Sequence, residues 1–145
     1  MRHSDLMVAP ARQVLTRLGL EELRTPAEVD AFMAKGRDGV ALLAVNSMCG
    51  CSAGSMRPAV ALALERGPKP RHAATVFAGQ DLAATARARE YLAGHPPSSP
   101  AIALFRDGAL VFLLQRADIQ GRPPHAIADA LADALAAHAS GEATR

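Results

Sequence analysis

The sequence predicts an α/β fold, a three-layer α/β/α sandwich around a mixed sheet of four to five strands. Three observations predict this architecture. An apolar run without polar alternation covers residues 40–45, as expected of a central strand that is covered on both faces. A helical stretch and a second apolar run at 73–78 follow it, which is the order of a βαβ unit. Two more apolar runs, 101–105 and 110–114, flank Asp107-Gly108, the strongest short hairpin signal.

Two helices are expected ahead of the first strand, over about residues 10–36. The first helix begins near Pro10, because proline suits the first helical turn, and it ends at Gly19. The second starts with a capping box, Thr25-Pro26-Ala27-Glu28, in which proline occupies the first helical position. Gly36 is its expected end. These helices form an N-terminal extension to the core of the fold.

The remaining elements give the order β-α-β-α-β-β-α from residue 40 onward, which is the thioredoxin-like order. The chain, 1–145, is expected to be one domain with its core at about 39–139. Pro58 should kink the helix in which it lies. The later helices are bounded by glycine, proline or a capping residue: from about Gly50 or Cys51 to Arg66, from Asp81 to Ala93, and from Pro123 or Pro124 onward.

Composition excludes several classes of protein. Half of the 145 residues are hydrophobic, only 3% are aromatic, and the formal net charge is +2. The arginines are scattered, whereas a nucleic-acid binder normally clusters them on one face with aromatic side chains nearby, so nucleic acid is not an expected partner. The N-terminus lacks the apolar stretch of a signal peptide, and no segment is long enough to span a bilayer. We therefore expect a cytoplasmic protein with no membrane partner, and the oligomeric state stays open.

The two cysteines, Cys49 and Cys51, follow directly on the first predicted strand. Ligands of open α/β sheets bind at the carboxyl ends of strands, and a helix N-terminus carries unpaired N–H groups and partial positive charge. This position favours a thiolate, which is the reacting species in disulfide exchange. We expect Cys49 to be the more exposed, nucleophilic thiol and Cys51 the resolving thiol. Gly50 should permit a tight, strained and readily reduced Cys49–Cys51 disulfide.

Three more residues are expected to support this site. Asn46 lies at the end of the strand that leads into the cysteine loop. Pro100 follows Ser98-Ser99 and directly precedes a strand. In thioredoxin-like proteins a cis-proline at this topological place faces the cysteine pair. The Ser99–Pro100 bond is therefore the candidate for a cis peptide.

Two other interpretations of Cys-Gly-Cys stay open. A soft-metal-binding protein would use the thiolates of Cys49 and Cys51. A structural zinc site needs four ligands, however, and the five histidines show no ligand-like pairing, so no metal is expected. The pair could also be structural cysteines that do not react.

Longer segments around these residues closely resemble the bacilliredoxin family, bacterial proteins with a thioredoxin-like fold and a Cys-Gly-Cys site. The resemblance implies a thiol–disulfide oxidoreductase that removes bacillithiol, a low-molecular-weight thiol, from S-bacillithiolated client proteins. Bacillithiol would be a thiol co-substrate, with no bound cofactor. Weak disulfide isomerase or reductase activity is associated with the family, so general isomerisation is the alternative function. The matching segments are 45–54, 57–58, 75–81, 97–100 and, more loosely, 116–121.

Overall fold

A five-stranded mixed sheet lies at the centre of the structure, a computed structural model that describes residues 4–143. The strands are β1 (Glu21–Glu22), β2 (Val40–Asn46), β3 (His72–Phe77), β4 (Ala101–Arg106) and β5 (Ala109–Leu114). Their order in the sheet is β1-β3-β2-β4-β5. β1 and β2 run parallel to β3, whereas β4 is antiparallel to β2 and β5 is antiparallel to β4. The predicted βαβ unit and hairpin are both confirmed.

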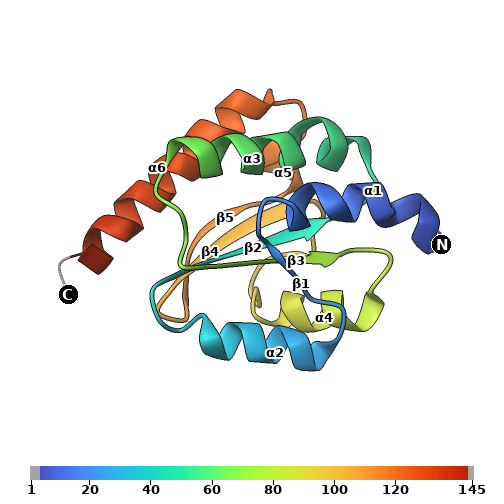
Figure 1. Cartoon of the computed structure of the whole chain (residues 1–145), viewed down its shortest axis with the longest axis horizontal. Helices are drawn as coiled ribbons and strands as arrows, with labels where there is room; N and C mark the ends of the chain where they lie inside the picture. The colour runs from blue at the N-terminus through green and yellow to red at the C-terminus, as the bar shows by residue number, and fades with distance from the viewer. Residues whose placement is uncertain (1–3, 144–145) are drawn as a thin grey trace.

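Helices cover both faces of this sheet, which confirms the predicted three-layer sandwich. The helices are α1 (Asp5–Thr16), α2 (Pro26–Lys35), α3 (Arg57–Arg66), α4 (Leu82–Glu90), α5 (Arg116–Ile119) and α6 (Pro124–Ala143), with a π-helical turn, η1 (Ser52–Met56), before α3. Figure 1 shows α1, α3 and α6 on one face and α2 and α4 on the other. Among the described residues no helix is both long and apolar enough to cross a membrane.

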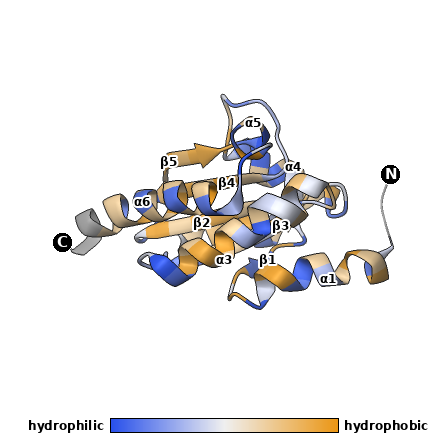
Figure 2. Cartoon of the chain, turned by 90° about the horizontal axis from the view of Figure 1, so that it is seen from above, coloured by the Kyte–Doolittle hydropathy of each residue, from blue (hydrophilic) through white to orange (hydrophobic). Residues whose placement is uncertain are grey.

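β2 is buried along its whole length because it contributes to two cores. Its even-numbered apolar residues, 40, 42 and 44, pack with residues of α3 and α6. Its odd-numbered residues, 41, 43 and 45, pack with residues of α2 and α4. Successive side chains of a strand point to opposite faces, so a strand between two helical layers has to be apolar at every position. In Figure 2 strands β2 and β5 are mainly apolar, while α6 alternates between apolar and polar turns.

The predicted start of the first helix, near Pro10, is wrong. α1 begins at Asp5, where the Ser4 hydroxyl caps it by accepting the Met7 N–H at 3.3 Å. Pro10 lies inside the helix and removes the N–H that would bond the carbonyl of Leu6. Residues 4–7 are exposed, so water can satisfy that carbonyl. The N-terminal extension therefore covers more than the predicted residues 10–36.

Pro58 does not simply kink an α-helix. The chain is helical from Gly50, but residues 52–56 form the wider π-helical turn, closed by the Arg57 N–H donating to Ser52 O. Proline lacks the donor for an α-helical bond to the residue four positions earlier, and its ring crowds that carbonyl. A widened turn directly before Pro58 accommodates both effects, and α3 then continues regularly to Arg66.

Two details of the later elements also differ from expectation. Asp81 occupies the N-cap of α4, but its side chain makes no capping hydrogen bond. Its carboxylate instead accepts two hydrogen bonds from the buried Arg12, at 2.7 and 3.1 Å. α4 ends at Glu90, and three turn residues separate it from Gly94. The short elements β1 and α5 have no counterpart among the predicted elements.

Candidate functional site

Cys49 lies between the end of β2 and the first turn of the helix that begins at Gly50. The Ser52 and Ala53 N–H groups donate to the Cys49 carbonyl at 3.1 and 3.2 Å, so the helix closes directly onto this residue. Cys51 lies inside the first turn, as predicted. This arrangement puts the Cys49 thiol at a helix N-terminus, where unpaired N–H groups and the helix dipole favour negative charge.

Two serine hydroxyls lie next to the Cys49 sulfur. Ser47 Oγ donates a hydrogen bond to Cys49 Sγ at 3.1 Å. Ser52 Oγ is 3.8 Å from the same sulfur and 2.8 Å from Ser47 Oγ. Both serines are buried, Ser52 completely. The sulfur therefore faces a fixed pair of hydroxyl groups on its buried side, and these can donate to a thiolate.

The pKa of Cys49 is lower than that of an ordinary thiol. Partial burial raises this pKa, because desolvation penalises the thiolate. The hydrogen bonds to Ser47 and Ser52, together with the backbone N–H groups of Ser52 and Cys51, lower it by more. Hydrogen bonds that favour the charged form thus outweigh desolvation, and Cys49 is the thiol that the site prepares for ionisation.

A buried polar pair, Asn46 and Arg57, fixes the loop that carries Ser47 and Cys49. The Asn46 amide donates to the carbonyl of Ala11 in α1 at 3.1 Å. Its Oδ1 accepts the Ser47 N–H and Arg57 Nη1, each at 2.9 Å. Arg57 Nη1 also donates to the Ser47 carbonyl at 2.9 Å. The loop is therefore held to both α1 and α3, and the predicted residue Asn46 lies at the centre of this network.

Sequence reasoning missed three members of the site: Ser47, Ser52 and Arg57. A usable signal was present, because both serines lie within one helical turn of Cys49. Arg57 carried a weaker signal, since it is a charged residue among apolar neighbours at the start of α3.

Cys51 and Gly50 lie in the chain as predicted. The role of Gly50 in a Cys49–Cys51 disulfide concerns the oxidised protein and stays a prediction. Both thiols are free and both are half-buried, and the expectation that Cys49 is the more exposed stays a prediction. Hydrogen bonding distinguishes the two thiols. Within residues 4–143, Ser47 and Ser52 lie within hydrogen-bond distance of Cys49 Sγ, and no hydrogen bond reaches Cys51 Sγ. Gly50 does not adopt a left-handed conformation here, and a Cβ at this position would meet no atom within 4 Å. With both thiols free, the backbone thus has no need of glycine at position 50.

Pro100 and Ser99 lie at the same edge of the sheet as the cysteine loop. The Ser99–Pro100 peptide bond is cis, which confirms that prediction. Ala101, the first residue of β4, pairs with Val45 near the end of β2. Because the two strands are antiparallel, Pro100, just before β4, lies at the end of β2 that leads into the cysteine loop. Pro100 is buried, and the Ser99 carbonyl accepts a hydrogen bond from Arg116 Nη1 at 3.3 Å.

No metal centre is evident in the part of the chain that the structure describes. It contains no group of three or more His, Cys, Asp or Glu side chains that could hold an ion. A metal bound by Cys49 and Cys51 would have two protein ligands, which is fewer than structural zinc sites use.

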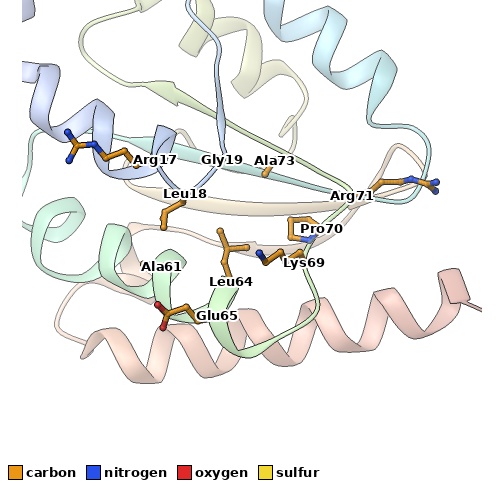
Figure 3. Close-up of a pocket in the computed structure, with 10 residues that line it drawn as sticks. All are labelled: Arg17, Leu18, Gly19, Ala61, Leu64, Glu65, Lys69, Pro70, Arg71 and Ala73. Carbon is orange, nitrogen blue, oxygen red and sulfur yellow. The ribbon is translucent and has the colours of Figure 1, made fainter.

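A concavity of about 560 Å³ lies away from the cysteine loop. It lies between the end of α1, the C-terminal half of α3 and the segment that leads into β3 (Figure 3). Its lining includes three cationic residues, but in Figure 3 the guanidinium groups of Arg17 and Arg71 point away from each other. Arg71 pairs with Asp38. The half-buried Cys49 precedes the opposite, N-terminal end of this helical segment.

Comparison with known proteins places this geometry in context. A family model described as "Disulphide isomerase" matches residues 3–139. A bacilliredoxin of Salinibacter ruber is 53% identical over 144 residues, covering 99% of this chain and 84% of the relative. A bacilliredoxin of Geobacillus kaustophilus is 51% identical over 125 residues, covering 86% of this chain and 85% of the relative.

Solved structures agree with the fold. The X-ray structure of Fasciola hepatica thioredoxin superposes with a TM-score of 0.57, covering 82% of this chain and 99% of that protein. The sequence identity is only 16%, so this likeness concerns the fold alone. It confirms the thioredoxin-like architecture that the element order predicts.

Proposed function

This chain belongs to the bacilliredoxin family of thioredoxin-like thiol–disulfide oxidoreductases, and on that premise we propose that it removes bacillithiol from S-bacillithiolated proteins. The single observation that carries the proposal is the environment of Cys49. Its sulfur accepts a hydrogen bond from Ser47 at the N-terminus of a helix, and its pKa is lowered. A thiol that ionises readily at the surface is what attack on a mixed disulfide requires.

In the first step, the Cys49 thiolate attacks the bacillithiol sulfur of the mixed disulfide on the client protein. A Cys49–bacillithiol S–S bond forms, and the client sulfur leaves as a thiolate with the electron pair of the broken bond. The client cysteine is thereby reduced, and Cys49 is oxidised to the adduct. Asn46 and Arg57 contribute by holding the loop on which Ser47 and Cys49 lie.

In the second step, the adduct is resolved by one of two thiols. Cys51, after losing its proton to solvent, attacks the Cys49 sulfur, so that the Cys49–Cys51 disulfide forms and bacillithiol leaves as a thiolate. Alternatively, a second bacillithiol attacks the adduct, forms bacillithiol disulfide and releases the Cys49 thiolate. A low-molecular-weight thiol also reduces the Cys49–Cys51 bridge. Such chemistry belongs in the reducing cytoplasm, where protein disulfides are transient.

The decisive experiment uses the Cys51→Ala protein in its reduced form, because it retains the nucleophile and lacks the resolving thiol. It is incubated with a bacillithiolated model protein and analysed by intact mass and peptide mapping. We expect the mass of one bacillithiol on Cys49 and a free thiol on the model protein. The matched Cys49→Ala variant should gain no mass. An adduct in the Cys49→Ala variant alone would reverse the roles of the two cysteines.

The alternative function, general disulfide isomerisation, is separated by the same reaction. If Cys49 stays unmodified by bacillithiol, a scrambled disulfide protein is the next substrate to test, and a mixed disulfide between Cys49 and that protein would favour isomerisation. Metal content of the protein purified under reducing conditions tests the soft-metal alternative. One metal ion per chain, lost in the Cys49→Ala variant, would favour it.

A further inference from the structure

Arg57 is a buried cation with no carboxylate partner in the described part of the chain. Only 9% of the residue is exposed. Its guanidinium donates to two neutral acceptors, Asn46 Oδ1 and the Ser47 carbonyl, both 2.9 Å from Nη1. Burying an unpaired charge costs several kcal/mol, roughly, so buried cations normally lie beside an anion. The structure therefore raises the question of which anion balances Arg57.

The charged side chains of the neighbouring elements are already engaged or exposed. From α1, Arg12 pairs with Asp81 and with Glu22 of β1. From α6, Asp129 pairs with Arg66 at the far end of α3, and Asp133 is exposed. None of these carboxylates is within ion-pair distance of Arg57.

Cys49 is the group that remains. Ser47 lies between Arg57 and Cys49. Its carbonyl accepts a hydrogen bond from Arg57, and its hydroxyl donates one to Cys49 Sγ. Burial lowers the pKa of Arg57, and the opposing influence that raises it is the negative charge of Cys49. Ser47 therefore links the two groups through hydrogen bonds, and the negative charge of Cys49 acts on the buried guanidinium.

We propose that Arg57 is a positioning residue that supplies the buried counter-charge of the Cys49 thiolate and so favours the reduced, ionised cysteine over its bacillithiol adduct. This rests on the proposed function only in taking Cys49 as the nucleophile. In the adduct the Cys49 sulfur is neutral, and Arg57 is left without an anion. Stabilising the thiolate makes Cys49 a better leaving group when a second bacillithiol thiolate attacks the adduct. That attack forms bacillithiol disulfide and returns the electron pair to Cys49.

Titration of a single thiol tests this proposal without any use of bacillithiol. In the Cys51→Ala background, the ionisation of Cys49 is followed by thiolate absorbance and by the alkylation rate as pH is varied. We expect Arg57→Met to raise the pKa of Cys49 enough to lower the thiolate fraction about tenfold at a pH below it. Arg57→Lys should recover most of that loss. Arg66→Met, which removes a cation from the other end of α3, should leave the titration unchanged.

A second comparison separates charge from hydrogen bonding and covers the case in which Arg57→Met does not fold. Arg57→Gln keeps an amide donor for the Ser47 carbonyl and lacks the charge, whereas Arg57→Lys keeps the charge. If the glutamine variant titrates like the lysine variant, Arg57 is only a structural tie and the proposal is overturned. Because these titrations use no bacillithiol, a failure of the proposed function would leave their outcome unaffected.

Discussion

The Ser47 hydroxyl donates a hydrogen bond to Cys49 Sγ at 3.1 Å, from the loop residue two positions before the cysteine. Ser47 is buried, so its hydroxyl has little access to water and stays aimed at the sulfur and at Ser52. The strand that precedes this loop is fully buried between two helical layers. A rigid element thus sets the position of the donor.

Replacing this serine should raise the pKa of Cys49. A hydrogen bond to a charged group contributes about 1.5 kcal/mol, which corresponds to roughly one pKa unit and a tenfold smaller thiolate fraction at a pH below the pKa. We expect Ser47→Ala to lower the alkylation rate of Cys49 by about that factor near neutral pH. Rates measured from pH 5 to 10 would show the whole curve displaced to higher pH.

Ser55→Ala is the control, because Ser55 is a serine of the neighbouring π-helical turn whose hydroxyl donates to the Arg122 carbonyl instead of Cys49. Its curve should coincide with that of the parent protein. Equal displacement in both variants would mean that the turn, and not the Ser47 hydroxyl, controls Cys49.

The lowered pKa of Cys49 also predicts how stability depends on pH. The folded protein releases the thiol proton at a lower pH than the unfolded chain does. Stability therefore rises as pH increases through the folded pKa, reaches its full gain above the unfolded value, and is lost as pH falls. Urea unfolding of the reduced parent and of Cys49→Ser across this range should show the difference growing with pH. A constant difference would contradict the assignment.

The sheet could be predicted from sequence because its signal is local. The uninterrupted apolar run of β2 and the Asp107-Gly108 turn each depend on neighbouring residues, and in the structure Asp107 and Gly108 have φ values of 52° and 90°. The start of the first helix could not be predicted, because an exposed first turn can precede a proline inside the helix: water satisfies the carbonyl that the proline leaves free. Local patterns thus predict elements better than they predict where those elements end.

The candidate site shows the same division between local and distant information. Cys49 and Cys51 could be placed because a strand end followed by a helix start is visible in the chain. The hydrogen bond between Asn46 and Arg57 could not be predicted, because it joins residues 11 positions apart and depends on the π-helical turn between them. Asn46 also reaches back to Ala11, and no pattern within either segment indicates that contact.

The sequence predicts Asp81 as a helix cap, but in the structure its carboxylate forms an ion pair with Arg12, and a substitution can test which role matters. Serine is as good an N-cap as aspartate, so Asp81→Ser would be nearly neutral if capping were its role. Instead the carboxylate binds the buried Arg12, which also lies 4.9 Å from the centre of the Phe77 ring. Without Asp81, the buried Arg12 keeps only the longer contact with Glu22, at 3.4 Å, and the loss should cost up to about 3 kcal/mol of the free energy of unfolding. Chemical denaturation measures this cost, and a loss below about 0.5 kcal/mol would restore the capping role.

A substitution of Gly50 can show whether glycine is needed at this position in the dithiol form, in the disulfide form, or in both. With both thiols free, residue 50 is exposed, lies at the start of the helix and has open space around its Cβ position. Gly50→Ala should therefore leave the reduced fold intact and stabilise it by about 0.5 kcal/mol, because alanine loses less conformational entropy than glycine. We expect the alanine to be unfavourable only in the oxidised protein, because its side chain restricts the backbone angles that the short Cys49–Cys51 disulfide ring needs.

The measurement pairs urea unfolding of the reduced protein with the equilibrium between its dithiol and disulfide in a thiol redox buffer. Gly50→Ala should shift that equilibrium toward the dithiol while the reduced protein stays at least as stable as the parent. Gly54→Ala is the control, since Gly54 lies in the next turn with equally open space around its Cβ position and takes no part in the ring. An unchanged dithiol–disulfide equilibrium in Gly50→Ala would show that the oxidised ring, like the reduced loop, has no need of glycine.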